Sequence, residues 1–195
     1  MKTSLEILTE EARGCTLCSA HLPLGPRPVF QISETARVLI AAQAPGTAVH
    51  ETGIPFNDPS GDRLRDWMGV DRDTFYDASR VAILPMGFCY PGRGKSGDLP
   101  PRPECAQTWR TPMLAALGEM PLTLVIGQYA AAWHFGKDGF KNLTERVRHW
   151  HDVSDGLFPL PHPSPRNNIW LTRNAWFESD VVPEIRARVA MAIGE

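Results

Sequence analysis

Short, unbroken runs of apolar residues mark the predicted strands. The run RVLIAA, from Arg37 to Ala42, is apolar at nearly every position. Such continuous runs are typical of strands that are buried on both faces of a parallel sheet. The same character recurs over residues 80–84, 122–127 and 156–160, so the pattern predicts four strands.

Helical segments alternate with these runs. Thr3-Ser4 is expected to cap a first helix over LEILTEEA, and Ser60 a second over GDRLRDWMG. Further helices are predicted over 106–117, 128–135 and 176–193. Strands that alternate with helices imply a parallel sheet covered on both faces. We therefore predict an α/β fold, a three-layer α/β/α arrangement around a central parallel four-stranded sheet, with residues 1–195 as a single domain.

Three turns rich in Pro or Gly lie where predicted strands end. They are AQAPG after the first strand, PMGFC after the second and HPSPRNN after the fourth. Ligands of open parallel sheets bind beyond the carboxyl ends of the strands. One such turn alone is most simply a tight connection, whereas three at the same edge of the sheet favour a binding site there.

All four cysteines of the chain fall into one pattern, Cys15-x2-Cys18 followed by Cys89-x15-Cys105. Thiolates grouped in fours hold either a tetrahedral zinc ion or an iron–sulfur cluster. The alternatives are two disulfides or unrelated buried thiols. The N-terminal MKTSLEILTEEARG carries charges throughout and has no apolar core, so we expect no signal peptide. Thiols inside the cell stay reduced, which favours metal over disulfides.

The overall composition sets further limits. A chain of 195 residues, 43% hydrophobic and 22% charged, is long enough for one domain with a proper core. No stretch reaches the apolar length of a membrane helix, and we expect a cytoplasmic, nucleoid-associated monomer without a membrane partner. The formal net charge of −2 means that a polyanion must be bound by a local basic patch.

These segments together resemble the uracil-DNA glycosylase superfamily. AQAPG with the following HETGIPFNDPSG resembles the first motif of its iron–sulfur branch. HPSPRNN resembles the second motif, with the Arg-Asn continuation of the single-strand-selective branch. The cysteine spacing is similar to that of the cluster ligands of the iron–sulfur branch, and LVIGQYAAAWHFG to its third strand and following helix. The resemblance implies the fold of that superfamily and a [4Fe–4S] cluster on Cys15, Cys18, Cys89 and Cys105.

The implied activity is hydrolysis of the N-glycosidic bond of a flipped-out uracil, or a related deaminated base in DNA, by a monofunctional glycosylase that leaves an abasic site. Phe56 corresponds to the aromatic platform under the base. His162 corresponds to the donor to the uracil oxygen that gains charge. Ser164 is expected to contact a phosphate, and Arg166 to insert into the duplex or contact a phosphate.

Local basic residues are consistent with DNA contact. Arg93, Lys95 and Arg102 fall between the last two cysteines, and Lys141, Arg146 and Arg148 precede the fourth predicted strand. Contacts of this kind position a nucleic acid without reading its sequence.

The first motif departs from the family pattern at its acidic position. Ala44 stands where some members carry Asp, and Gln43 replaces the Glu of the iron–sulfur branch. Gln43 can orient water or donate to the base, but it cannot act as a base. Asp58 is our first choice for positioning the water, ahead of Glu51 and Asp62, and His50 is a further candidate to line the pocket.

A second departure concerns base recognition. The iron–sulfur branch carries a uracil-reading Asn four residues before its third cysteine, and this chain has Pro85 there. Base contacts are then expected from Gln43, Ala44 or Asn57, or from the main chain of the segment Met86, Gly87 and Phe88. Hypoxanthine, xanthine and mismatched thymine remain open as substrates.

Two other functional classes stay open on the sequence. One is a non-catalytic damaged-DNA-binding protein of the same fold. The other is a zinc-stabilised hydrolase of a free nucleotide, because Gly-rich turns at strand ends also suit phosphates.

Overall fold

A parallel sheet lies at the centre of the protein. The computed structural model describes residues 2–95, 97–137, 139–153 and 156–194. The strands are β1 (Val38–Ala41), β2 (Val81–Ile83), β3 (Leu122–Ile126) and β4 (Leu157–Leu160). They are ordered β2-β1-β3-β4 and all pair in parallel, with Ile40 in register with Ile83 and Leu124. The predicted four-stranded parallel sheet is confirmed.

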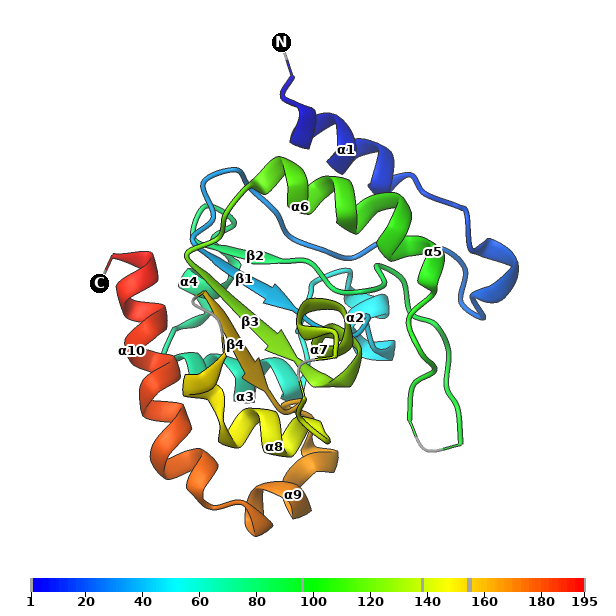
Figure 1. The fold of residues 1–195 in the computed structure, drawn as a ribbon. Coiled ribbons are helices and arrows are strands. Elements are labelled where there is room, and N and C mark those ends of the chain that lie inside the picture. The colour runs from blue at the N-terminus through cyan, green and yellow to red at the C-terminus, as the bar shows by residue number, and fades with distance from the viewer. Residues whose placement is uncertain (1, 96, 138, 154–155, 195) are drawn as a thin grey trace.

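Helices cover both faces of this sheet (Figure 1). On one face α1 (Ser4–Arg13) packs against α6 (Thr111–Leu117), and both bury apolar side chains against Leu39. On the other face α3 (Pro59–Met68) and α10 (Val182–Ile193) pack against Val38 and Ile40. Alternate residues of β1 thus enter opposite layers, as the period of a strand requires. The result is the predicted three-layer α/β/α arrangement.

The other helices are short. They are α2 (Thr47–Thr52), α4 (Arg72–Tyr76), α5 (Pro103–Cys105), α7 (Gly127–Phe135), α8 (Leu143–Arg148) and α9 (Asn168–Arg173). Single 3-10 turns cover Ser19–His21, Trp150–Asp152 and Pro165–Asn167. Of these, α7 matches the helix predicted over 128–135, and α5 directly precedes the helix predicted over 106–117. The rest have five or six residues each, too few for a periodic apolar pattern to emerge.

Two predicted helices contain a wider π-helical turn. One is Ala106–Arg110, just before α6, and the other is Phe177–Val181, just before α10. Each is followed within two residues by a proline, Pro112 or Pro183. Proline lacks an N–H and its ring crowds the carbonyl four residues earlier, so the helix widens there and then continues.

The beginning of α3 differs from the prediction. We expected Ser60 to cap this helix, but the cap is Asp58, whose Oδ1 accepts the N–H of Gly61 at 2.9 Å. Pro59 takes the first helical position, where its fixed φ suits the helix and its missing N–H leaves no donor unpaired. Ser60 therefore lies inside the first turn. At the chain start, Thr3 caps α1 as predicted, in a capping box with Glu6.

Within the described residues, no helix is both long enough and apolar enough to cross a membrane.

Candidate active site at the carboxyl edge of the sheet

A cavity of about 1050 Å³ lies at the carboxyl ends of the strands. Its walls come from the segments that follow all four strands: 42–47 after β1, Pro85 after β2, the first turn of α7 after β3, and Pro161, His162, Ser164 and Arg166 after β4. The strand order changes direction between β1 and β3, which is where open α/β sheets bind their ligands. The predicted position of the site is thus matched by a cavity, large enough for an extruded nucleotide.

Phe56 stands on an unusual turn at the edge of this cavity. Its φ of 54° is the only positive value of a non-glycine residue in the described chain. The residue lines the cavity, and its ring packs edge-on against Phe75, with the centroids 6.1 Å apart. The turn lies so close to α3 that a Cβ on Gly61 would stand 1.7 Å from the carbonyl oxygen of Phe56. Strained backbone of this kind persists only where the surroundings fix it, typically at functional sites.

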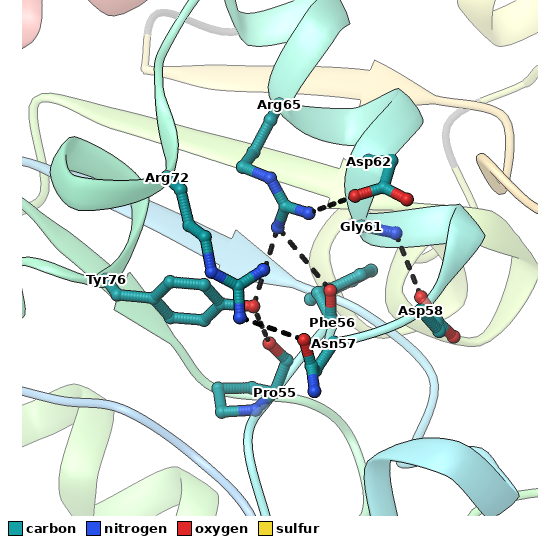
Figure 2. A network of polar contacts seen from close by, with 9 residues as sticks. All are labelled: Pro55, Phe56, Asn57, Asp58, Gly61, Asp62, Arg65, Arg72 and Tyr76. Carbon is teal, nitrogen blue, oxygen red and sulfur yellow. Dashed lines mark hydrogen bonds and ion pairs between the residues drawn. The ribbon is translucent and has the colours of Figure 1, made fainter. Parts of the chain in front are cut away.

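The surroundings that fix this turn are polar (Figure 2). Arg65, buried in α3, donates from Nη1 to the carbonyl of Phe56 at 3.5 Å and is paired with Asp62 at 2.6 Å. The hydroxyl of Tyr76 donates to the carbonyl of Pro55 at 2.9 Å and lies 3.5 Å from the same guanidinium nitrogen. The carbonyls on both sides of the Pro55–Phe56 link are therefore held by buried or half-buried side chains.

Asn57 faces this network and not the cavity. Its Oδ1 accepts from Nη2 of Arg72 at 2.9 Å, and the residue is absent from the cavity lining (Figure 2). The structure thus does not bring Asn57 to the base-reading position considered for it. Asp62 is likewise occupied, in its ion pair with Arg65, and Glu51 and His50 lie outside the lining as well.

Asp58 is the acidic residue of the first motif that reaches the cavity. As the N-cap of α3 it holds the Gly61 N–H with one oxygen (Figure 2), while Oδ2 has no hydrogen-bond partner in the described part of the chain. The N-terminus of a helix favours a negative charge at this position. One oxygen of Asp58 is therefore fixed by the fold and the other is available to a ligand or a water.

His162 lies opposite, on the loop after β4. The N–H of Ser164 donates to its Nδ1 at 3.2 Å, and the side-chain amide of Asn167 donates to its carbonyl at 2.7 Å. Burial lowers the pKa of His162, the charge of Arg166 lowers it further, and Asp58 and Asp98 raise it. An imidazole whose Nδ1 accepts a hydrogen bond is neutral and carries its proton on Nε2. His162 therefore presents a neutral N–H donor at the cavity.

Arg63 of α3 joins the two motifs. Its Nη1 donates to the carbonyls of Pro163 and Ser164, both at 3.2 Å, and its Nη2 donates to Oδ1 of Asn168 at 2.8 Å. The helix capped by Asp58 thereby also holds the loop of His162. Sequence reasoning did not find this residue, because nothing local distinguishes it from a solvated arginine.

A sequence model of the uracil-DNA glycosylase superfamily matches residues 29–186. This match covers most of the chain, including both motifs and all four strands. The chain belongs to the uracil-DNA glycosylase superfamily. Membership in this superfamily supports a glycosylase-type hydrolase of DNA repair with DNA as its partner. The cavity between the two glycosylase motifs is then the candidate active site.

The base-contact residues predicted around β2 are not in this glycosylase cavity. Met86, Gly87 and Phe88 are absent from its lining, and their N–H groups are already used. Met86 donates to Ala42 and Gly87 to Gln43, which extends the pairing of β1 and β2, while Phe88 donates to Sγ of Cys105. Among residues 84–95, only Pro85 reaches the cavity.

Gln43 and Ala44 do line the cavity, as predicted. Nε2 of Gln43 donates to the carbonyl of Leu99 at 3.2 Å. Its Oε1 has no protein partner in the described ranges. The side chain can therefore offer an acceptor to a ligand, while its nitrogen fastens a neighbouring loop.

The four cysteines gather in a second, smaller pocket beside α5, and all four line it as free thiols. Burial raises the pKa of Cys89 to about 11 and that of Cys105 to about 12. Burial also raises the pKa of Cys18. Metal binding would have to remove these protons, so it would release protons and depend on pH.

The four sulfur atoms do not form a ready-made tetrahedral zinc site. A tetrahedral zinc ion with Zn–S bonds of about 2.3 Å brings its sulfurs to within about 3.8 Å of one another. Among the described residues, no three of these four sulfurs lie within 4.8 Å of each other. Buried Nε of Arg102 and Nε1 of Trp109, both of which line this pocket, lack hydrogen-bond partners among the same residues. A single zinc ion would therefore require the thiols to move closer together than they lie in this structure.

Some of the predicted basic residues are exposed or line the cavity, and others are buried or engaged with neighbouring side chains. Arg93 and Lys95 are exposed, and Lys141 and Arg166 line the cavity. Arg146 is buried, with its guanidinium 4.9 Å from the ring centre of Phe135, so the structure does not support it as a surface contact for DNA. Arg148 is exposed but lies over Trp176, and Arg102 is paired with Glu104 beside the cysteines.

Proposed function

We propose that this protein is a monofunctional glycosylase that removes uracil, or a related deaminated base, from DNA and leaves an abasic site. One observation carries the proposal: His162, Asp58 and Phe56 line the same cavity. His162 offers a neutral N–H donor, and Asp58 has one oxygen bound to the Gly61 N–H and the other without a partner among the described residues. These three groups are what the chemistry requires on the two sides of the bond that breaks.

In the proposed mechanism the extruded base stacks on Phe56. As the bond between C1′ and the base nitrogen breaks, the electron pair leaves with the base and the sugar becomes cationic. Nε2–H of His162 donates to the base oxygen that gains negative charge, an electrostatic contribution that grows toward the transition state. The free oxygen of Asp58 holds the water whose oxygen bonds to C1′, and the proton of that water passes to Asp58 and then to solvent.

Recognition of the base is proposed to use few side chains. Pro85 removes the amide that the family resemblance would place at this wall, so the acceptor Oε1 of Gln43 is assigned to a ring N–H of the base. Uracil, hypoxanthine and xanthine each present such a group next to a carbonyl. We therefore expect activity on more than one deaminated base.

DNA is proposed to lie over the cavity rim. Arg166 is exposed and lines the cavity, where it either enters the space left by the extruded base or binds a phosphate. The hydroxyl of Ser164 accepts the N–H of Arg166 at 3.3 Å, which leaves its proton for a phosphate oxygen. Arg93 and Lys95 add exposed positive charge nearby. Binding through such contacts should weaken steeply as salt increases.

We also propose that Cys15, Cys18, Cys89 and Cys105 bind a [4Fe–4S] cluster. Support comes from the four cysteines, which line one pocket, and from the unpaired donors described above. When bound, the cluster would tie the segment after α1 to α5, and its role is structural because glycosidic hydrolysis moves no electron. No step of the mechanism passes through it.

The proposed activity is tested by incubating excess protein with labelled oligonucleotides that each carry one uracil, hypoxanthine, xanthine or mismatched thymine. Alkali-labile abasic sites should form in the uracil strand and in at least one purine strand. Tight binding without any abasic site would instead support the damaged-DNA-binding protein. Hydrolysis of a free nucleotide alone would support the third functional class.

A further inference from the structure

The loop between the third and fourth cysteines carries a hairpin that reaches the active site. In Figure 1 this loop projects from the sheet between β2 and α5. Within it, Arg93 and Asp98 face each other in an antiparallel bridge, and the N–H of Leu99 donates to the carbonyl of Gly92 at 2.8 Å. The conformation around Asp98 is therefore fixed by backbone pairing.

This hairpin contacts both motifs of the site. On one side, Nε2 of Gln43 donates to the carbonyl of Leu99 at 3.2 Å. On the other side, Nη1 of Arg166 lies 2.9 Å from the position that a Cβ on Gly97 would take. Any side chain at residue 97 would displace that guanidinium. The hairpin is thus held between the first-motif loop and the second-motif loop.

Asp98, between these two contacts, has its carboxylate at the cavity. The residue lines the cavity together with Asp58 and His162, and its Oδ2 lies 3.7 Å from the position of a Cβ on Gly46. Its negative charge and that of Asp58 both raise the pKa of His162, against the larger effect of burial. Asp98 therefore lies near enough to His162 for its charge to affect the pKa of that imidazole.

The carboxylate of Asp98 is also available to a ligand. It makes no side-chain hydrogen bond or ion pair with any residue that the structure describes, whereas Asp58 has one oxygen engaged by Gly61. Asp98 is solvent-exposed in the free protein. Bound DNA would remove water from this rim, and charge interactions strengthen when water is excluded.

We propose that Asp98 is a second catalytic carboxylate, which faces the sugar as it becomes cationic while Asp58 holds the attacking water. This inference rests on the proposed glycosylase function. As the C1′–N bond breaks and its electron pair leaves with the base, positive charge spreads over C1′ and the ring oxygen. The carboxylate of Asp98 stabilises that charge, and no proton or covalent bond is exchanged with it.

The test is Asp98→Asn in the full-length protein, with single-turnover cleavage of a uracil-containing strand and binding to the same strand carrying a non-cleavable abasic analogue. We expect cleavage to slow at least tenfold while binding stays equal or tightens, because one negative charge near the phosphates is removed. Glu119→Gln is the matched control. It removes an exposed carboxylate before β3, at the opposite edge of the sheet, and should change neither quantity.

A second measurement follows the position of the carboxylate without any chemistry. The pKa of His162, titrated by NMR, should fall in Asp98→Asn, because a charge that raises it is gone. Cleavage by Asp98→Asn within twofold of the wild type, or an unchanged His162 pKa, would overturn the inference. A wild-type protein that cleaves no base at all would instead refute the proposed function, so the two failures are distinguishable.

Discussion

Substitution of Gly61 by alanine tests how the active-site turn is held. A Cβ at this position would lie 1.7 Å from the carbonyl oxygen of Phe56, and real Cβ contacts are essentially never shorter than 3.0 Å. The turn or the start of α3 must therefore move by at least 1.3 Å, the difference between these two distances. The contacting atom belongs to the backbone, so no side-chain rotation can relieve the clash.

This displacement should affect chemistry more than folding. The moving parts carry Phe56 and Asp58, and a misplacement of about 1 Å at a reacting centre can cost about a hundredfold in rate. The hydrogen bond from Gly61 to Asp58 would also weaken, and loss of a helix cap costs about 1 kcal/mol of stability. We expect Gly61→Ala to remain folded, with a lower Tm and a single-turnover rate about a hundredfold below the wild type.

The matched control is Gly14→Ala. Gly14 has a φ of −87°, and its added Cβ would have ordinary contacts at 3.7 and 3.9 Å, so both rate and Tm should be nearly unchanged. Thermal unfolding and single-turnover cleavage measured on both variants give the comparison. A Gly61→Ala protein that cleaves at the wild-type rate would show that the strained turn in Figure 2 does not position the catalytic groups.

Three further predictions follow from the same structure. Asp58→Asn should slow cleavage about tenfold or more at saturating protein. It should not weaken DNA binding, because the amide oxygen still accepts the Gly61 N–H. Weakened binding at an unchanged cleavage rate would contradict the role of Asp58 in holding the water. Cys89→Ser should lower both the iron content and the Tm, measured by metal analysis and thermal unfolding, and stoichiometric zinc without iron in the wild type would exclude the cluster. Burial beside Arg110 lowers the pKa of His134 to about 4, so the unfolded chain binds the extra proton and stability should fall from about pH 6.5 down to pH 4. Urea unfolding of His134→Gln should show a shallower fall over that range, and an identical fall would contradict the assignment.

The sequence was most informative where local pattern decides structure. Continuous apolar runs such as that of β1 can only be satisfied by burial on both faces, and the sheet follows from them. The position of the cavity follows as well, because the carboxyl ends of parallel strands meet at one edge. His162 and Phe56 were located by motif resemblance, and the structure places both at that edge.

The remaining features depend on contacts between distant segments. The amides of Met86 and Gly87 appeared free along the chain, but they pair with the end of β1, which no local pattern encodes. Arg63 contacts a loop about one hundred residues away in sequence, and Asp98 reaches the cavity on a hairpin that Gln43 contacts from the first motif. Loops positioned by tertiary contacts carry much of the chemistry of a site and show the weakest sequence signals.

The most direct test of the central claim compares the wild type with His162→Ala in abasic-site formation on a uracil strand at saturating protein. We predict that the wild type forms abasic sites and that the variant does so at least about a hundredfold more slowly, because one donor to the developing anion is lost. Binding to the uncleaved strand should be nearly equal for both proteins. Equal cleavage rates, or no abasic sites from the wild type on any deaminated base, would contradict the account.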